Sequence, residues 1–181
     1  MRKKLIALIS CVAVVLALLS GTSLAYYTVT EIATNVITTG GVSVAVHETT
    51  ANGEAFPAEG VSILPGDTVS KIVWFENTGS APLYLRVKLD KGVKDSTLSA
   101  EDCLVIDLDS ANWTYQGGYY YYNSPLTPGN STGEMFTEVH FDADAIDNDY
   151  IGKIFTLDIT AYAVQTVHNG ATVLDAQGWP G

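Results

Sequence analysis

Hydrophobic and polar residues alternate with a period of two along most of the chain after residue 40. Residues 83–89 read L-Y-L-R-V-K-L, so every second side chain is Leu or Val and those between are Tyr, Arg and Lys. A period of two is typical of a strand that buries one face. Similar strand-like segments occur at residues 42–46, 69–76, 134–141 and 153–167. The pattern therefore predicts a succession of short strands.

Turn-forming residues separate these segments, and amphipathic helical periodicity is nearly absent after residue 25. The cluster N-T-G-S-A-P at 77–82 follows the segment 69–76, which we expect to pair with 83–89 as an antiparallel hairpin. Many short strands without alternating helices indicate an all-β fold, an antiparallel jelly-roll-like β-sandwich. No repeat or linker divides residues 26–181, which we predict to be one domain with a loosely structured tail at 168–181.

The first 25 residues have the pattern of a signal peptide. Three positive residues are followed by an apolar run at 5–19, and G-T-S-L-A at 21–25 supplies small residues before a cleavage point between Ala25 and Tyr26. The apolar run is shorter than the roughly 20 residues that a spanning helix needs. A retained membrane anchor is the less favoured alternative, because small residues and no positive patch follow the run. We therefore predict a secreted or cell-surface protein, extracellular and free of the membrane after processing.

The charge balance narrows the class of partner. Removal of residues 1–25 takes Lys plus Arg from 9 to 6 against 20 Asp and Glu, so the formal charge changes from −11 to −14. Such acidity argues against nucleic acid and against anionic membrane surfaces as partners. It is compatible with solubility and with divalent cations.

No catalytic motif is present. The three histidines, His47, His140 and His168, lie far apart in sequence, and neither H-E-x-x-H nor C-x-x-C occurs. A G-x-S-x-G nucleophile elbow is absent as well. Cys103 is followed by the apolar residues Leu104 and Val105, and we expect it to be buried and unreactive. The sequence thus predicts a protein that is not an enzyme.

One acidic segment is a candidate metal site. The carboxylates of Asp142, Asp144, Asp147 and Asp149 are spaced closely enough to supply oxygen ligands to calcium. The spacing departs from the EF-hand, in which a glycine stands at the position of Asp147. We favour a solvated loop between strands, with calcium as the alternative and no other cofactor expected.

A cluster of aromatic residues is a candidate glycan platform. Its members are Trp113, Tyr115, Tyr120 and Tyr122, from a stretch that also contains Tyr119 and Tyr121. Consecutive tyrosines in a strand point alternately to opposite faces, so two of the four at 119–122 share each face. A structural role at the edge of the core is the favoured interpretation.

The segment 26–38 (Y-Y-T-V-T-E-I-A-T-N-V-I-T) is rich in Thr, Val and Ile, lacks Pro and Gly, and carries one charge. Such a segment is either a strand of its own domain or a donor strand for another chain. As a donor it would fill core grooves with Val29, Ile32 and Val36. Val29 and Ile32 differ in parity, so a bulge or a register change is expected if both are buried.

Three blocks of sequence carry a resemblance to a known family. They are G-T-S-L-A-Y-Y-T (21–28), the block I-L-P-G-D-T-V-S-K-I-V-W-F-E-N-T-G-S-A-P-L-Y-L-R-V (63–87) and G-Y-Y-Y-Y-N-S-P-L-T-P-G-N-S-T (118–132). With the long final strand through 161–165, the chain resembles the TasA/camelysin family of Gram-positive bacteria. The resemblance implies a jelly-roll subunit that is exported with a SipW-type signal peptidase. It also implies self-association into biofilm fibres, in which the freed N-terminal segment completes the sheet of the next subunit.

The prediction is accordingly a secreted structural subunit of cell-surface or biofilm-matrix fibres, assembled by N-terminal strand addition. One alternative is a monomeric surface adhesin or glycan-binding module that uses the aromatic cluster. The other is a camelysin-like surface peptidase, which the absence of a zinc motif disfavours.

Overall fold

The computed structural model describes residues 27–29, 34–38, 41–58 and 60–180, and these residues form two β-sheets. The larger sheet has the order β4 (Val61–Ile63), β1 (Tyr27–Val29), β11 (Ile154–Gln165), β6 (Leu83–Val93), β9 (Tyr119–Tyr122) and β8 (Trp113–Gln116), with β2 (Thr34–Thr38) also paired to β11. The smaller has the order β3 (Val44–Thr49), β5 (Thr68–Asn77), β10 (Ser131–Phe141) and β7 (Leu104–Ile106). Two short 3₁₀ turns are η1 (Asn148–Tyr150) and η2 (Val173–Asp175).

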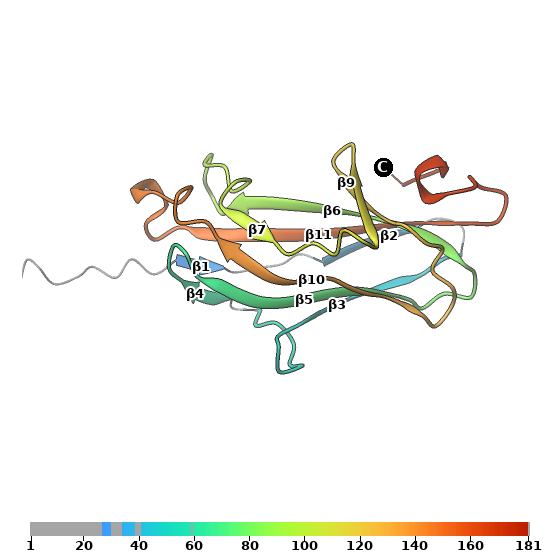
Figure 1. Ribbon diagram of the computed structural model, residues 1–181, viewed down its shortest axis with the longest axis horizontal. Coiled ribbons are helices and arrows are strands. Elements are labelled where there is room, and N and C mark those ends of the chain that lie inside the picture. Colours follow the sequence, from blue (N-terminus) through green and yellow to red (C-terminus); the bar gives the residue numbers. More distant parts are fainter. Residues whose placement is uncertain (1–26, 30–33, 39–40, 59, 181) are drawn as a thin grey trace, which may run out of the picture.

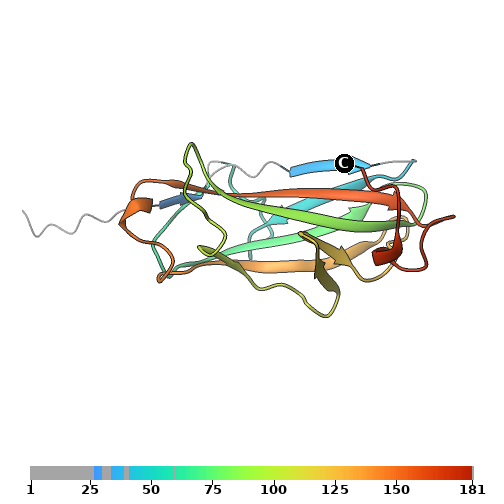
Figure 2. The same cartoon turned by 90° about the horizontal axis from the view of Figure 1, so that it is seen from above.

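The two sheets lie face to face in an elongated sandwich (Figures 1 and 2). The predicted all-β sandwich is confirmed, whereas the jelly-roll order of its strands remains a prediction. Most pairings are antiparallel, as expected. Two differ: β1 and β2 both run parallel to β11.

The core lies between the sheets and follows the alternation of the sequence. On β6, Leu83, Leu85 and Val87 are fully buried, as the pattern predicts. Every second residue of β5 and of β11 also faces inward, from Val73 and Phe75 on one strand and from Phe155 to Ala163 on the other. Burial of apolar surface at about 25 cal/mol per Å² makes these inner faces the main source of stability.

The predicted hairpin between residues 69–76 and 83–89 is wrong. β5 lies in the smaller sheet, between β3 and β10, whereas β6 lies in the larger sheet, between β11 and β9. The N-T-G-S-A-P segment is therefore a corner between the two sheets. A cluster of turn formers reverses the chain in both cases, and local sequence does not choose between a hairpin and a corner.

Asn77 holds this corner together. Its buried amide donates hydrogen bonds to the carbonyl oxygens of Ala81 (2.9 Å) and Leu126 (2.8 Å), and its Oδ1 accepts one from the N–H of Gly79 (2.9 Å). A side chain at Gly79 would place a Cβ 2.8 Å from the backbone nitrogen of Ser43, so only glycine fits there. The F-E-N-T-G motif thus has a structural explanation.

The C-terminal tail is ordered on the outer face of the larger sheet, which corrects the expectation of a loose tail over its described part, 168–180. A second small apolar cluster holds it, made of Tyr84, Val164, Val173 and Ala176, with Tyr121 and Trp179 packed against them. Asn169 links the tail to the end of β11, because its amide donates to the carbonyls of Gln165 on that strand and of Gln177 in the tail. The tail therefore has its own packed interface.

An arginine fastens the end of the tail. The guanidinium Cζ of Arg86 lies 4.0 Å from the ring centroid of Tyr119 and 4.7 Å from that of Trp179, so it sits against both rings. Such cation–π contacts contribute about 0.5–2 kcal/mol each, more when they are shielded from water.

Replacing Trp179 with alanine is expected to lower the free energy of unfolding by about 1–2 kcal/mol, because the ring's contacts with Arg86 and Tyr121 are lost. Urea unfolding measures the change. Leu174→Ala is the matched control, since Leu174 belongs to the same tail and is exposed; its expected cost is below about 0.5 kcal/mol. Equal costs for the two variants would contradict a docked tail.

Candidate functional site

The N-terminal strands occupy one side of β11. β1 lies between β4 and β11: Thr28 is aligned with Ser62 of β4 in antiparallel register and with Ile154 of β11 in parallel register. β2 continues along β11, from Thr34 opposite Ile159 to Thr38 opposite Ala163. The N-terminal segment thus has an inner part, hydrogen-bonded on both sides, and an outer part that pairs with β11.

β4 depends on this insertion. Among the pairings that the structure describes, β1 is the strand that connects β4 to the larger sheet. Ile63 of β4 is nevertheless almost fully buried in the main core. A chain without β1 would have an empty slot between β4 and β11, next to a core residue that needs cover.

β11 also needs a partner on this side. Its other edge pairs with β6 from Phe155 opposite Val93 to Gln165 opposite Leu83. Without β1 and β2, the free edge of β11 would present a row of unpaired N–H and C=O groups, and such an edge accepts another strand readily. The sheet is complete only when a segment with strand character occupies this edge.

The register of the two strands differs by one residue. Val29 is aligned with Phe155, and Val36 is aligned with Ala161, so a separation of seven residues on the N-terminal segment faces six on β11. Phe155 and Ala161 are both buried on the inner face of the sheet. The two pairings therefore differ in register by one residue between Val29 and Val36, and both valines are aligned with core-facing positions of β11. The change expected between Val29 and Ile32 stays a prediction, because Ile32 lies outside the described residues.

β2 leaves an apolar side chain partly exposed to solvent at the edge of the sandwich. Val36 is 42% exposed, although its partner Ala161 is buried. Within a single chain, Val36 therefore does not lie in the core. The filling of a core groove in another subunit by Val36 stays a prediction. Val29 is placed only by its backbone, and Ile32 lies outside the described residues, as do residues 1–25 and the predicted cleavage point at Ala25 and Tyr26. β2 is thus held on β11 more by its backbone pairing than by burial of apolar side chains.

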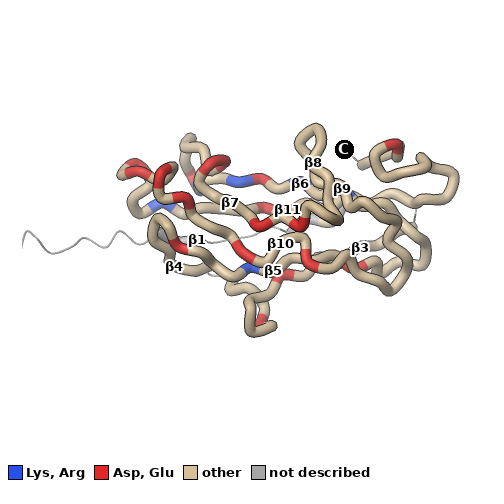
Figure 3. Tube along the Cα trace, in the orientation of Figure 1, with Lys and Arg blue, Asp and Glu red and all other residues tan. Residues whose placement is uncertain are grey.

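The acidic segment forms turns. Asp142 Oδ1 accepts a hydrogen bond from the N–H of Asp144 (2.8 Å), and Asp147 Oδ1 accepts one from the N–H of Asp149 (2.9 Å). In the described part of the chain, no three His, Cys, Asp or Glu side chains are grouped to hold a metal ion. The structure therefore does not gather the four carboxylates as ligands, and calcium binding remains a prediction. Acidic residues are spread over many strands and loops (Figure 3).

The histidines and the cysteine lie apart. His47 stacks on Trp74 on the outer face of the smaller sheet, and its Nε2 is 3.0 Å from Glu76 Oε2. His140 Nδ1 contacts the Thr68 hydroxyl at 3.1 Å. Burial raises the pKa of the Cys103 thiol, which is the opposite of activation.

The predicted glycan platform is divided by the fold. Trp113 is buried between Phe75 and Tyr122, with ring centroids 5.6 and 5.3 Å away, so it cannot line a surface site. Tyr115 is 61% exposed at the end of the β8–β9 hairpin, against the ring of Tyr120. Tyr120 and Tyr122 are half-buried against the core, so Tyr115 is the one exposed ring of the four.

The other two tyrosines of β9 point to the opposite face. Tyr119 stacks on Arg86, and Tyr121 packs against Trp179 of the tail. Local sequence pattern did not predict that Tyr119, Tyr121, Arg86 and Trp179 come together. The available signal was the alternation of the tyrosines at 119–122, together with Arg86 on the polar face of β6 between Tyr84 and Lys88.

No model of a known protein family matches the chain, and a search of curated proteins finds no match either. Among the residues that the structure describes, no helix is long and apolar enough to cross a bilayer.

Proposed function

We propose that this chain is a secreted structural subunit, which assembles into cell-surface or biofilm-matrix fibres by donating its N-terminal strands to the next copy. The observation that carries the proposal is the position of β1, hydrogen-bonded between β4 and β11. A segment from a second copy would find the same two partners. The donor and the slot belong to one chain, so each subunit supplies one and receives one. Such a head-to-tail arrangement forms an open filament when the rotation between subunits does not close a ring.

Three further observations support exchange between copies. Residues 27–38 precede the rest of the fold, so they can leave without breaking another connection. β2 pairs through its backbone and leaves Val36 nearly half exposed, which lowers the apolar contribution lost on leaving. Third, the resemblance to TasA-like proteins in the blocks 21–28, 63–87 and 118–132 favours this class of assembly.

Export belongs to the same proposal. Cleavage after Ala25 by a SipW-type signal peptidase would free Tyr26 and the donor segment outside the cell. Retention of residues 1–25 would place an apolar peptide directly before β1. Processing would therefore restrict assembly to the extracellular side, where the acidic chain carries a formal charge of −14.

The test compares the chain starting at Tyr26 with one starting at Gly41. We expect filaments from the first in electron microscopy over days, and none from the second. The second chain lacks β1 and β2, so its melting temperature should fall by about 10 °C or more. A synthetic peptide of residues 26–38 should restore most of that loss without producing filaments, whereas a scrambled peptide should not.

Two results would contradict the proposal. One is filament formation by the chain that starts at Gly41. The other is a full mature chain that stays monomeric in light scattering at high concentration over the same days, while the 26–38 peptide has no effect on the shorter chain.

A further inference from the structure

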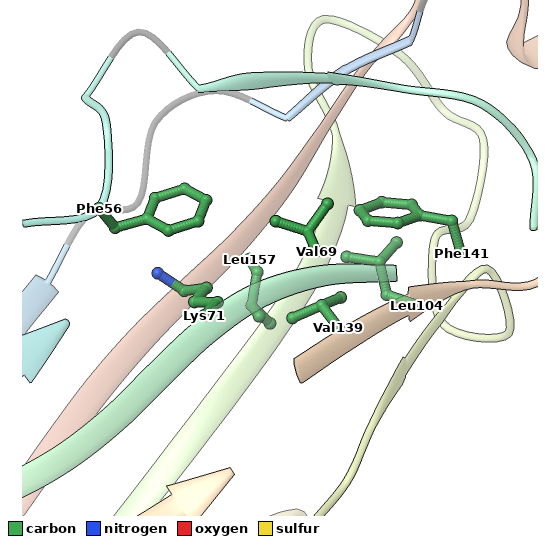
Figure 4. A pocket seen from close by; sticks show the side chains of 7 residues that line it. All are labelled: Phe56, Val69, Lys71, Leu104, Val139, Phe141 and Leu157. Carbon is green, nitrogen blue, oxygen red and sulfur yellow. The ribbon is translucent and has the colours of Figure 1, made fainter. Parts of the chain in front are cut away.

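A lysine lies inside the sandwich. Lys71 on β5 has the same parity as the core residues Val73 and Phe75, and its side chain is 2% exposed. Figure 4 shows it among apolar side chains, with its nitrogen directed toward Phe56. The residues that line this small cavity with it are Phe56, Val69, Leu104, Val139, Phe141 and Leu157.

Glu48 on the neighbouring strand is its partner. Glu48 is aligned with Val73 across the β3–β5 pairing, and its side chain is only 13% exposed. Lys71 Nζ is in direct contact with Glu48 Oε2, and it also lies 4.2 Å from the ring centroid of Phe56. An amine and a carboxyl group are therefore held together in an apolar enclosure.

This enclosure disfavours charge. Taking an ammonium and a carboxylate out of water carries a large desolvation cost, which their mutual attraction offsets only in part. Burial accordingly lowers the pKa of Lys71, although the adjacent Glu48 acts in the opposite direction. The uncharged amine, which is the nucleophilic form, is thereby favoured more than at a surface lysine.

We propose that Lys71 and Glu48 become joined by a side-chain amide bond in the folded protein. A proton first passes from the ammonium to the carboxylate, so that a single transfer yields both the neutral amine and the carboxylic acid. The Nζ lone pair then attacks Cδ of Glu48, forming the C–N bond. The C–O bond to the hydroxyl breaks, and the hydroxyl leaves with a proton from the nitrogen as one water. No oxidant or reductant takes part.

Two features of the fold favour this condensation. The strands hold the two groups together, and well-oriented intramolecular pairs react as if at effective concentrations of about 10⁵–10⁸ M. The product is neutral, so it relieves the cost of two buried charges. The bond would fasten β3 to β5 and close the segment 49–70 into a loop. It involves neither β1 nor β2, and it is therefore independent of the proposed strand exchange.

Trypsin digestion of the denatured mature chain provides the test. Lys71 is the first Lys or Arg after residue 25, and the next is Arg86, so a free Lys71 gives the peptides 26–71 and 72–86. An amide on Lys71 blocks cleavage there. We then expect the single peptide 26–86, lighter than its sequence mass by one water, about 18 Da, and a yield of peptide 72–86 about ten-fold or more below that of Lys71→Arg.

The Lys71→Arg variant is the matched control. Arginine keeps the positive charge and the trypsin site but does not form this amide, so peptide 72–86 should appear in full yield. Glu48→Ala removes the acyl group and should also restore cleavage after Lys71. The unsubstituted chain decides the matter even if a variant folds poorly: after days in the folded state, full release of peptide 72–86 and no loss of water would overturn the proposal.

Discussion

Replacing Asn77 with alanine is expected to lower the free energy of unfolding by about 3 kcal/mol, the largest effect we expect from a single polar side chain. The substitution removes three hydrogen bonds. The Leu126 carbonyl still accepts from the N–H of Leu83 (3.0 Å) and the N–H of Gly79 still donates to the Ser43 carbonyl (3.2 Å), so the loss falls mainly on the Ala81 carbonyl. Each buried polar group left unsatisfied costs about 1–3 kcal/mol. Asn77, the turn at 79–81 and the segment around Leu126 would no longer be joined by these hydrogen bonds. Urea unfolding followed by tryptophan fluorescence measures the change.

Asn123→Ala is the matched control for this prediction. Asn123 also bridges two segments, accepting a hydrogen bond from the Thr114 hydroxyl (2.7 Å) and donating one to the carbonyl of Ala111 (3.3 Å). It is exposed, so water replaces the lost partners, and the expected cost is below about 1 kcal/mol. If both substitutions cost the same, burial is not what makes Asn77 important, and the corner has another anchor.

The sequence contained more about this corner than the turn formers alone suggest. Lys71 and Asn77 share the parity of Val73 and Phe75, so the alternation that predicts a buried face also places two polar residues on it. A polar side chain on a buried face requires a partner inside the protein. That partner comes from a strand or loop distant in sequence, and period-two alternation carries no information about it.

Dependence on segments distant in sequence also explains why the strand pairing could not be predicted. Alternation identified the strands at 83–89, 134–141 and 153–167, since it depends on each segment alone. Whether β5 pairs with β6, or turns into the other sheet, depends on which edges the remaining strands offer. The parallel pairing of β1 and β2 with β11 likewise could not be predicted from local pattern, because it joins segments more than a hundred residues apart in sequence.

The packing of the tail is hard to predict from the sequence for a different reason. Its glycines and polar residues are typical of a loop, yet Val173, Ala176 and Trp179 recur at every third position. These three residues pack together on the outer face of the larger sheet. This three-residue spacing is the signal in the sequence that the tail packs. The surface on which the tail packs includes Tyr84 of β6 and Val164 of β11, and it forms only when these two strands have paired.

Intermolecular strand exchange predicts a covalent ladder from a single pair of cysteines. Thr28 and Ser62 are directly opposite across the antiparallel β1–β4 pairing. Such residues have Cα atoms about 4.5–5.5 Å apart, which is within the range that a disulfide bridges. Two chains are prepared, Thr28→Cys and Ser62→Cys, each with one new cysteine. The native Cys103 is buried and common to both, and the unsubstituted chain provides its baseline.

Mixed under mild oxidation while filaments grow, the two chains should give a disulfide-linked heterodimer in non-reducing electrophoresis. The chain that carries both Thr28→Cys and Ser62→Cys should give a ladder, because every subunit then reacts at each end. A chain with Thr28→Cys and Glu54→Cys is the control, since Glu54 is exposed and has no pairing with β1, and should give no ladder.

The ladder separates two arrangements that look alike within one subunit. If β1 stays in its own chain, the doubly substituted protein closes an internal disulfide and remains a monomer on the gel, however many filaments the sample contains. Filaments would then be held by another surface, and the slot between β4 and β11 would be a purely internal feature. If β1 enters the next copy, the parallel pairing to β11 and the antiparallel pairing to β4 are retained across the junction, and Thr28 meets Ser62 of a different chain. The backbone registers are the same in both arrangements, but the disulfide products differ. An internal disulfide shows that β1 comes from the same chain, and a ladder shows that it comes from another.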